Sequence, residues 1–236
     1  MSTNINLGTN HPFHEFENKS ALELEFAAKI CHLLSESIIN NGVASIALSG
    51  GSTPKELFKL LSQEELDWEK IIVTLVDERW VKNDSPLSNE KFLKENLLIN
   101  NASKANFKSM VPESFDIDVA VNDYDTFLSN LSSPFDIVIL GMGSDGHTAS
   151  WFPDAIEIDK ALDPNGPKVL ITTPKSQPTQ RITLGIPMVI NARNIFLHIT
   201  GEEKKDVLFN VSNTDDLPIH KTFKQANKPI DIFWAT

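Results

Sequence analysis

Apolar residues along this chain follow two different patterns. Short continuous runs such as Val43–Leu48 predict strands that are buried on both faces. Stretches such as the one containing Leu22, Phe26 and Ile30 carry apolar residues at intervals of three and four, which predicts amphipathic helices. The remaining predicted strands lie at residues 71–76, 106–111, 136–140, 169–172, 181–184, 195–199 and 230–235. Strands that alternate with helices are typical of βαβ units, so we expect an α/β protein with a parallel sheet covered by helices on both faces.

Local signals mark where the helices begin. Ser20 to Glu23 has the pattern of a capping box, and Gly42 marks the end of that helix. Pro54 is expected at the first position of the next helix, and further helices are expected from residues 88, 118, 187 and 201. No linker, low-complexity tract or internal repeat interrupts the sequence. We therefore expect one domain over residues 1–236.

Polar or glycine-rich segments follow four of the predicted strands, at Ser49, Asp77, Gly141 and Thr200. In parallel sheets, ligands bind beyond the carboxyl ends of the strands. We therefore expect these four segments to assemble one shared site.

The composition limits the classes of partner. A chain of 236 residues with 41% hydrophobic and 22% charged residues has an ordinary globular composition. The formal net charge of -11 argues against nucleic acid and anionic membrane surfaces as partners, because both require a basic face. Residues 1–8 lack the basic segment and apolar core of a signal peptide, and no apolar run has the length of a membrane span, so we expect a cytosolic protein. The single cysteine, Cys31, fits a reducing compartment and is expected to be a small core residue.

A glycine turn that opens a helix is formed by Gly50, Gly51, Ser52, Thr53 and Pro54. Such a turn presents free backbone N–H groups and the positive end of the helix dipole, with two hydroxyls beside them, which is the outline of a phosphate site. It lacks the lysine of a nucleotide-binding P-loop, so ATP is not indicated. The alternative, an ordinary helix cap and tight turn, remains open because Ser and Thr are common caps.

Two further cations are placed where they could complete an anion site. Arg181 starts a predicted strand, and Lys204 and Lys205 lie in the first turn of a predicted helix. Basic side chains in that turn oppose the helix dipole unless an anion is near, so we interpret one of the two lysines as a ligand contact. The alternative for each is a solvated surface residue.

Gly141, Gly143 and Gly146 match the spacing of a dinucleotide-binding fingerprint. That fingerprint requires an uninterrupted helix after the third glycine and an acid at the end of the next strand. Pro153 interrupts the helix too early, and Asp163 lies inside a turn. Nicotinamide and flavin binding are therefore disfavoured.

Asp145 and His147 lie two residues apart between these glycines. Histidine is the side chain best suited to proton transfer near neutral pH, and a carboxylate can orient its ring and stabilise its cation. We interpret this pair as catalytic, against the alternative of a surface histidine.

Other polar clusters are less specific. Asp77, Glu78 and Arg79 follow a strand and belong either to the site or to a mutually neutralising surface cluster. His11 and His14 lie in a terminal segment that we expect to be mobile, and no other cluster has the spacing of metal ligands. The sequence also lacks a Gly-x-Ser-x-Gly elbow, so a serine nucleophile is not indicated. We expect neither a metal nor another cofactor.

Taken together and in order, the motifs resemble the 6-phosphogluconolactonase family, within a wider group that includes glucosamine-6-phosphate deaminase. The segments that carry the resemblance span most of the chain. They are Leu48–Pro54, Val76–Trp80, Ser88–Asn89, Gly141–Ser150, Arg181–Thr183 and Thr200–Lys204.

The resemblance implies a doubly wound, mostly parallel Rossmann-like sheet and metal-free hydrolysis of 6-phosphoglucono-δ-lactone to 6-phosphogluconate. It places His147 at the lactone carbonyl. Our own hypothesis for the mechanism is that His147 acts as general base oriented by Asp145, with Arg79 or loop N–H groups near Gly143 as candidates for stabilising the oxyanion. The phosphate is implied to lie among Gly51, Ser52, Thr53, Arg181 and Lys204. Gly50, Asp77 and Asn89 complete the expected binding site.

Phe152 separates the nearest relatives. Deaminases of the wider group carry a glutamate shortly after the histidine, and Phe152 takes its place here. The lactonase is therefore preferred over a deaminase or sugar-phosphate isomerase. A sugar-phosphate-binding protein without catalysis is the third possibility, and it is disfavoured because Asp145 and His147 are both present. We expect a monomer or a weak homodimer.

Overall fold

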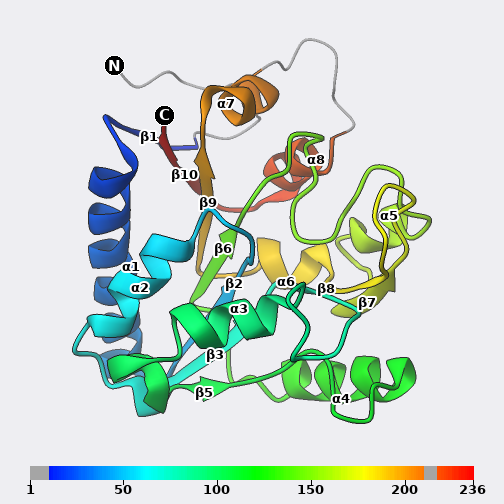
Figure 1. The fold of residues 1–236 in the computed structure, drawn as a ribbon, viewed down its shortest axis with the longest axis horizontal. Coiled ribbons are helices and arrows are strands. Elements are labelled where there is room, and N and C mark those ends of the chain that lie inside the picture. The colour runs from blue at the N-terminus through cyan, green and yellow to red at the C-terminus, as the bar shows by residue number, and fades with distance from the viewer. Residues whose placement is uncertain (1–10, 210–216) are drawn as a thin grey trace.

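A seven-stranded sheet runs through the molecule, and every neighbouring pair of its strands is parallel (Figure 1). The computed structural model describes residues 11–209 and 217–236. The strands stand in the order β1-β10-β9-β6-β2-β3-β5. Their bounds are Phe13–Phe16 (β1), Ile230–Ala235 (β10), Asn194–Thr200 (β9), Ile137–Leu140 (β6), Ala44–Leu48 (β2), Ile71–Leu75 (β3) and Asn106–Phe107 (β5).

The strand order reverses between β2 and β6. From β2 the chain proceeds outward to β3 and β5, and it then returns to the other side of β2 for β6, β9 and β10. In doubly wound sheets the crevice beyond such a reversal is the usual ligand site. The loops after Leu48 and Leu140 therefore meet where a ligand is expected.

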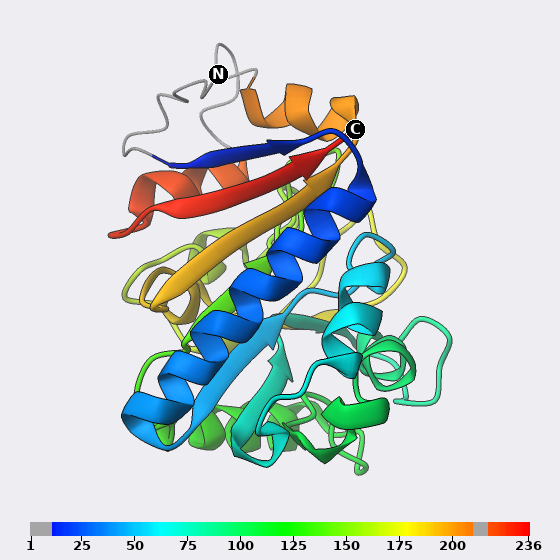
Figure 2. The ribbon, with the colours of Figure 1, turned by 90° about the vertical axis from the view of Figure 1, so that its left-hand side faces the viewer.

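Helices cover both faces of this sheet. α1 crosses one face over β10, β6 and β2 and packs against α2, while α6 and α8 lie on the other side (Figures 1 and 2). The bounds are Lys19–Asn41 (α1), Lys55–Gln63 (α2), Asn89–Asn96 (α3), Ile117–Ser129 (α4), Ile158–Ala161 (α5), Ile186–Ile190 (α6), Glu202–Phe209 (α7) and Pro218–Gln225 (α8), with short 3-10 helices at Trp68–Lys70 and Asn100–Lys104. The predicted fold class, a doubly wound α/β protein, is confirmed. None of these helices within residues 11–209 and 217–236 has the length and apolar character needed to cross a membrane.

The apolar stripe of α1 forms much of the core on its face. Leu22, Phe26, Ile30 and Leu34 are buried, as their spacing predicts, and the Phe26 ring stacks on Phe233 of β10 with a centroid distance of 4.2 Å. Burying side chains of this size contributes roughly 1.5–3 kcal/mol each. This packing fixes the position of α1 on its face of the sheet.

A separate three-stranded antiparallel sheet stands beside the large one. It has the order β4-β8-β7, with bounds Asp77–Arg79, Arg181–Leu184 and Val169–Thr172. The sequence predicts strands at residues 169–172 and 181–184, but it does not predict that they form a separate sheet with β4. Segment 173–180 between them is shorter than the dozen or more residues that a parallel crossover needs, so the strands pair antiparallel.

Several local expectations also differ from the structure. The first helix begins at Lys19, because the Asn18 side chain accepts a hydrogen bond from Ala21 N (3.0 Å), so Ser20–Glu23 is not its capping box. Pro54 lies one residue before α2 rather than within it. His11 and His14 do not lie in a mobile terminus, since β1 pairs with β10 and His11 Nδ1 accepts from Ile230 N (2.8 Å).

Candidate functional site

A cavity of about 260 Å³ opens at the carboxyl ends of β2 and β6, beside the reversal of strand order. Segments from four strand ends contribute to it, as the sequence predicts. Its lining residues are Ser49, Gly50, Gly51, Ser52, Thr53, Pro54, Asp77, Arg79, Asn89, Ile139, Leu140, Gly141, Met142, Gly143, His147, Ala149, His198 and Lys204. Ten of the twelve predicted site residues are therefore on its wall, and Asp145 and Arg181 do not line it.

The N-terminus of α2 forms one side of the cavity. Gly51 has a φ of +93°, a conformation that favours glycine, and it turns the chain from β2 into the helix. Pro54 precedes the helix and provides no side-chain cap, so the first N–H groups of α2 have no side-chain acceptor. Ser52 and Thr53, which directly precede Pro54, also line the cavity. The arrangement suits an anionic group such as a phosphate.

Gly50 makes room for a neighbouring side chain. A Cβ added at Gly50 would lie 2.1 Å from Asn89 Oδ1, so only glycine permits the contact between the turn before α2 and the start of α3.

The two lysines in the first turn of α7 have different surroundings. Lys204 lines the cavity, whereas Lys205 Nζ is 2.9 Å from Glu15 Oε1 and 3.7 Å from the centre of the Trp234 ring. Burial lowers the pKa of Lys204 from its ordinary value, the charge of Glu203 opposes this, and repulsion from Lys19 adds to it. Of the two lysines, Lys204 is thus the one on the cavity wall.

His147 stands on another side of the cavity and is paired with Asp145. Their Nδ1 and Oδ1 atoms are 2.5 Å apart, and the His147 N–H also donates to Asp145 Oδ1 (3.2 Å). Burial raises the pKa of Asp145, but the hydrogen bonds and charge of His147 outweigh burial, so the pKa lies below its ordinary value. Asp145 is therefore ionised and engages Nδ1 of His147, so that Nε2 is the imidazole nitrogen available to a ligand in the cavity.

Glycine at position 143 is required by the same loop. A Cβ there would lie 2.2 Å from His147 Cε1, so Gly143 makes space for the imidazole. The Gly143 N–H donates to the His147 carbonyl (2.9 Å) and is thus engaged within the loop. That N–H is therefore not free to stabilise an oxyanion, and Arg79 and the other loop N–H groups near Gly143 remain as candidates.

The Phe152 ring packs against the imidazole of His147. The rings of His147 and Phe152 stack with centroids 4.0 Å apart at 24°, and the Arg181 guanidinium carbon lies 5.7 Å from the centre of the same phenyl ring. Phe152 therefore contacts both His147 and Arg181. The sequence could identify Phe152 as a replacement for an acid but not as a stacking partner.

Arg79 and Arg181 are direct partners in the small antiparallel sheet. Arg79 lines the cavity and donates from Nη1 to Leu87 O (2.6 Å), while Arg181 is buried and donates from Nη2 to Gln177 Oε1 (2.9 Å). Burial lowers the pKa of Arg181, attraction to Asp77 opposes this, and repulsion from Arg79 adds to it. Both arginines contribute positive potential to this end of the cavity.

The small sheet also anchors the His147 loop. Ser150 Oγ donates to Asp77 Oδ2 (2.5 Å), Trp151 Nε1 donates to Leu184 O (2.8 Å), and Thr172 Oγ1 donates to Ser150 O (3.0 Å). These bonds fix the segment that follows His147 to all three strands of the sheet.

One buried histidine on the cavity wall was not predicted. His198 on β9 has its Nε2 atom 3.3 Å from Glu23 Oε1 of α1, and both side chains are buried. A polar residue near the carboxyl end of an otherwise apolar strand was the only signal in the sequence.

The fold and the cavity define a class. This is a doubly wound α/β protein whose switch-point cavity combines an uncapped helix N-terminus and a lysine with a histidine–carboxylate pair, which equips it to bind an anionic small molecule and transfer a proton.

The model of the glucosamine-6-phosphate isomerases/6-phosphogluconolactonase family matches residues 17–234, and the chain belongs to that family. It is 39% identical over 226 residues to a 6-phosphogluconolactonase of Rhizobium meliloti (strain 1021), covering 94% of this chain and 97% of the relative. It is 37% identical to one of Mesorhizobium japonicum, covering 97% of each chain. The crystal structure of a 6-phosphogluconolactonase from Shewanella baltica OS155 superimposes with a TM-score of 0.92 at 40% identity, covering 99% of this chain and 100% of that one. The resemblance predicted from the motifs is confirmed.

Proposed function

We propose that this protein hydrolyses 6-phospho-D-glucono-1,5-lactone to 6-phospho-D-gluconate in the oxidative pentose phosphate pathway. The relatives named above, matched over nearly their whole length, support this reaction. The observation that carries the proposal is a single cavity in which the His147–Asp145 pair and the uncapped end of α2 face the same space.

In this proposal His147 is the general base. Asp145 holds Nδ1, so Nε2 takes a proton from water while the water oxygen attacks the lactone carbonyl carbon. The carbonyl oxygen becomes an oxyanion that Arg79 stabilises. When the carbonyl re-forms, the bond from that carbon to the ring oxygen breaks, and the ring oxygen leaves as a hydroxyl with the proton from His147. Water is consumed, no metal or other cofactor takes part, and the protein returns to its starting state.

The phosphate group of the substrate is assigned to the N-terminus of α2. Gly51, Ser52 and Thr53 supply N–H and hydroxyl donors there, and Lys204 supplies a full positive charge. Arg181 acts at longer range, because it does not line the cavity. Asp77, Asn89 and Arg79 remain for the sugar and the reacting carbonyl.

A deaminase or sugar-phosphate isomerase is the alternative within the family. Phe152 argues against it, because a phenyl ring stacked on His147 cannot carry the proton that the glutamate of deaminases carries. A binding protein without catalysis is disfavoured by the close His147–Asp145 pair. We further place the protein in the cytosol as a monomer or weak homodimer that binds neither nucleic acid nor membranes, which suits its net charge of -11.

The test is acid release from freshly generated 6-phosphogluconolactone, compared with spontaneous hydrolysis. We expect enzyme-dependent acid release, together with no ammonia release from glucosamine 6-phosphate. Ammonia release without lactone hydrolysis would establish the deaminase instead, and binding of 6-phosphogluconate without either reaction would establish the binding protein.

A further inference from the structure

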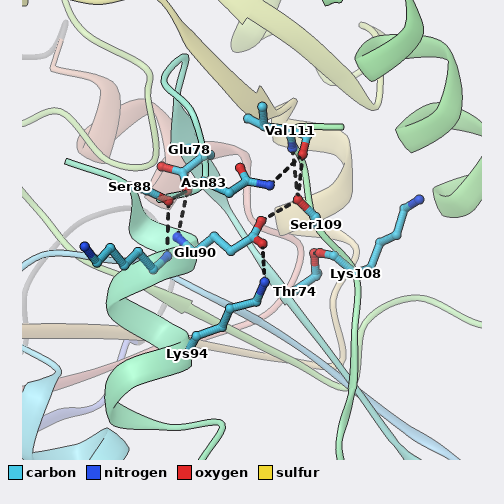
Figure 3. A network of polar contacts seen from close by, with 10 residues as sticks. Thr74, Glu78, Asn83, Ser88, Glu90, Lys94, Lys108, Ser109 and Val111 are labelled. Carbon is cyan, nitrogen blue, oxygen red and sulfur yellow. Dashed lines mark hydrogen bonds and ion pairs between the residues drawn. The ribbon is translucent and has the colours of Figure 1, made fainter. Parts of the chain in front are cut away.

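Glu78 is buried at the centre of a set of hydrogen bonds but does not line the cavity. Its Oε1 accepts from Arg79 N (2.6 Å) and Asn89 N (2.8 Å), and its Oε2 accepts from Ser88 Oγ (2.8 Å) and Glu90 N (2.7 Å). Figure 3 shows Glu78 beside Ser88 at the start of α3, with Glu90 continuing toward Lys94 and Ser109. A strand residue therefore supplies the acceptor for the N-terminal N–H groups of a helix.

The alternation of β4 explains why Glu78 faces α3. Successive side chains of a strand point to opposite faces, so Asp77 and Arg79 reach the cavity while Glu78 points away from it. Burial raises the pKa of Glu78, and its four hydrogen bonds oppose that shift. The carboxylate thus connects two elements that both contribute to the cavity.

Asn89 is the residue on which this connection acts. It is the first residue of α3, its side chain is buried on the cavity wall, and its Nδ2 donates to Asp77 O (3.0 Å). Its Oδ1 has no hydrogen-bond partner among the described residues. The Oδ1 atom is also shielded from solvent beside Gly50. A buried acceptor left without a donor is costly, so a rotation of the amide that lets an incoming hydroxyl group donate to Oδ1 would be favoured.

We propose that Glu78 is a positioning residue that fixes Asn89, and that Asn89 Oδ1 accepts a hydrogen bond from a hydroxyl group of the bound sugar phosphate. This inference rests on the proposed function, because it takes the ligand to be a sugar phosphate. Asn89, held in place by Glu78, recognises the sugar, whereas the end of α2 recognises the phosphate.

The experiment compares Glu78→Gln with Glu90→Gln. Both replace a buried carboxylate in the same network, but the Glu90 side chain contacts Lys94 and Ser109 rather than the start of α3. Affinities for 6-phosphogluconate and for inorganic phosphate are measured by calorimetry. Glu78→Gln should weaken 6-phosphogluconate binding about tenfold and leave phosphate binding unchanged, because an amide presents a donor to N–H groups that need an acceptor. Glu90→Gln should leave both affinities unchanged.

A double variant tests whether Glu78 acts through Asn89. Asn89→Ala alone should weaken 6-phosphogluconate binding about tenfold, and Glu78→Gln added to it should have no further effect. The inference is overturned if the two effects multiply, if Glu78→Gln weakens both ligands equally, or if Glu90→Gln has the same effect as Glu78→Gln.

Ser88→Ala provides a milder variant if circular dichroism shows that Glu78→Gln does not fold. It removes one donor to the Glu78 carboxylate and should weaken 6-phosphogluconate binding selectively but less. Unchanged affinity in folded Ser88→Ala would then refute the positioning role. Because these are binding measurements, an absence of lactone hydrolysis in the wild type would refute the proposed function without deciding this inference.

Discussion

The N-termini of α2 and α3 meet at the contact between Gly50 and Asn89 but are used in opposite ways. At α3, Ser88 accepts from Lys91 N (3.1 Å) and the Glu78 carboxylate accepts from the first two N–H groups of the helix. At α2, Pro54 provides no cap, and the preceding hydroxyl residues line the cavity. Both ends attract negative charge. One is filled by the protein's own carboxylate, whereas the other is open to an anion from solution.

The largest expected effect comes from removing His147, which lines the same cavity as the open N-terminus of α2. His147→Ala should lower kcat for the lactone by about 10²- to 10⁴-fold, because it removes the general base while leaving the end of α2 intact. KM should change little. The assay is acid release from fresh lactone, corrected for spontaneous hydrolysis.

The matched control is His32→Ala, since His32 is exposed on α1 and pairs only with Glu36 among the described residues. It should retain wild-type kcat. Near-normal turnover by His147→Ala would mean that another group activates the water.

A carboxylate introduced at the open N-terminus of α2 should fill it, as Glu78 fills the N-terminus of α3. In Ser52→Glu, the new side chain should occupy the anion site as Glu78 does at α3, which lowers kcat/KM by about 100-fold through lost phosphate contacts. The free energy of unfolding should not fall, since a negative charge near a helix N-terminus is stabilising. Kinetics and urea unfolding measure the two quantities.

Ser52→Gln has a side chain of the same size without the charge and should lose much less activity. If Ser52→Glu and Ser52→Gln behave alike, then steric exclusion rather than charge closes the site. Full activity in Ser52→Glu would place the phosphate elsewhere.

The adjacent lysines of α7 give the next largest contrast. Lys204→Ala should lower kcat/KM by about 10- to 150-fold, the range expected for loss of one charged hydrogen bond to phosphate. Lys205→Ala should leave kcat/KM unchanged, because Lys205 contacts Glu15 and Trp234 instead of the cavity. Steady-state kinetics of both variants would decide, and equal losses would contradict the assignment of Lys204.

The sequence predicts the open helix end better than the closed one. The glycine turn before α2 and the loop containing His147 are continuous segments whose residue types already indicate their chemistry. The end of α3 depends on a contact between Glu78 and residues 88–90, and Asp77 to Arg79 was equally consistent with a surface cluster. Alternation along β4 could be applied only once that segment was known to be a strand.

In the fold, too, features set by local sequence were predictable and features set by tertiary contacts were not. Buried strands such as Ile137–Leu140 and the stripe of α1 follow from local periodicity, which packing reinforces. β1 is short and lies at the sheet edge, and its stability comes from pairing with β10, so local sequence carried little signal for it. The stacking of Phe152 on His147 and the position of His198 beside Glu23 likewise depend on tertiary packing.

The smallest predicted effect is on the free energy of unfolding. It distinguishes the N-terminus of α3, which a side chain caps, from that of α2, which none does. Ser88→Ala should lower the free energy of unfolding by about 0.5–2 kcal/mol, because it removes the side-chain cap of α3 and a donor to Glu78. Ser52→Ala should leave it unchanged, since no side chain caps α2. Urea unfolding at neutral pH, with both variants measured in parallel, tests this difference. A loss of stability in Ser52→Ala as large as that in Ser88→Ala would mean that Ser52 caps α2 in solution, and the end of α2 would then be closed by its own hydroxyl until a phosphate displaces it.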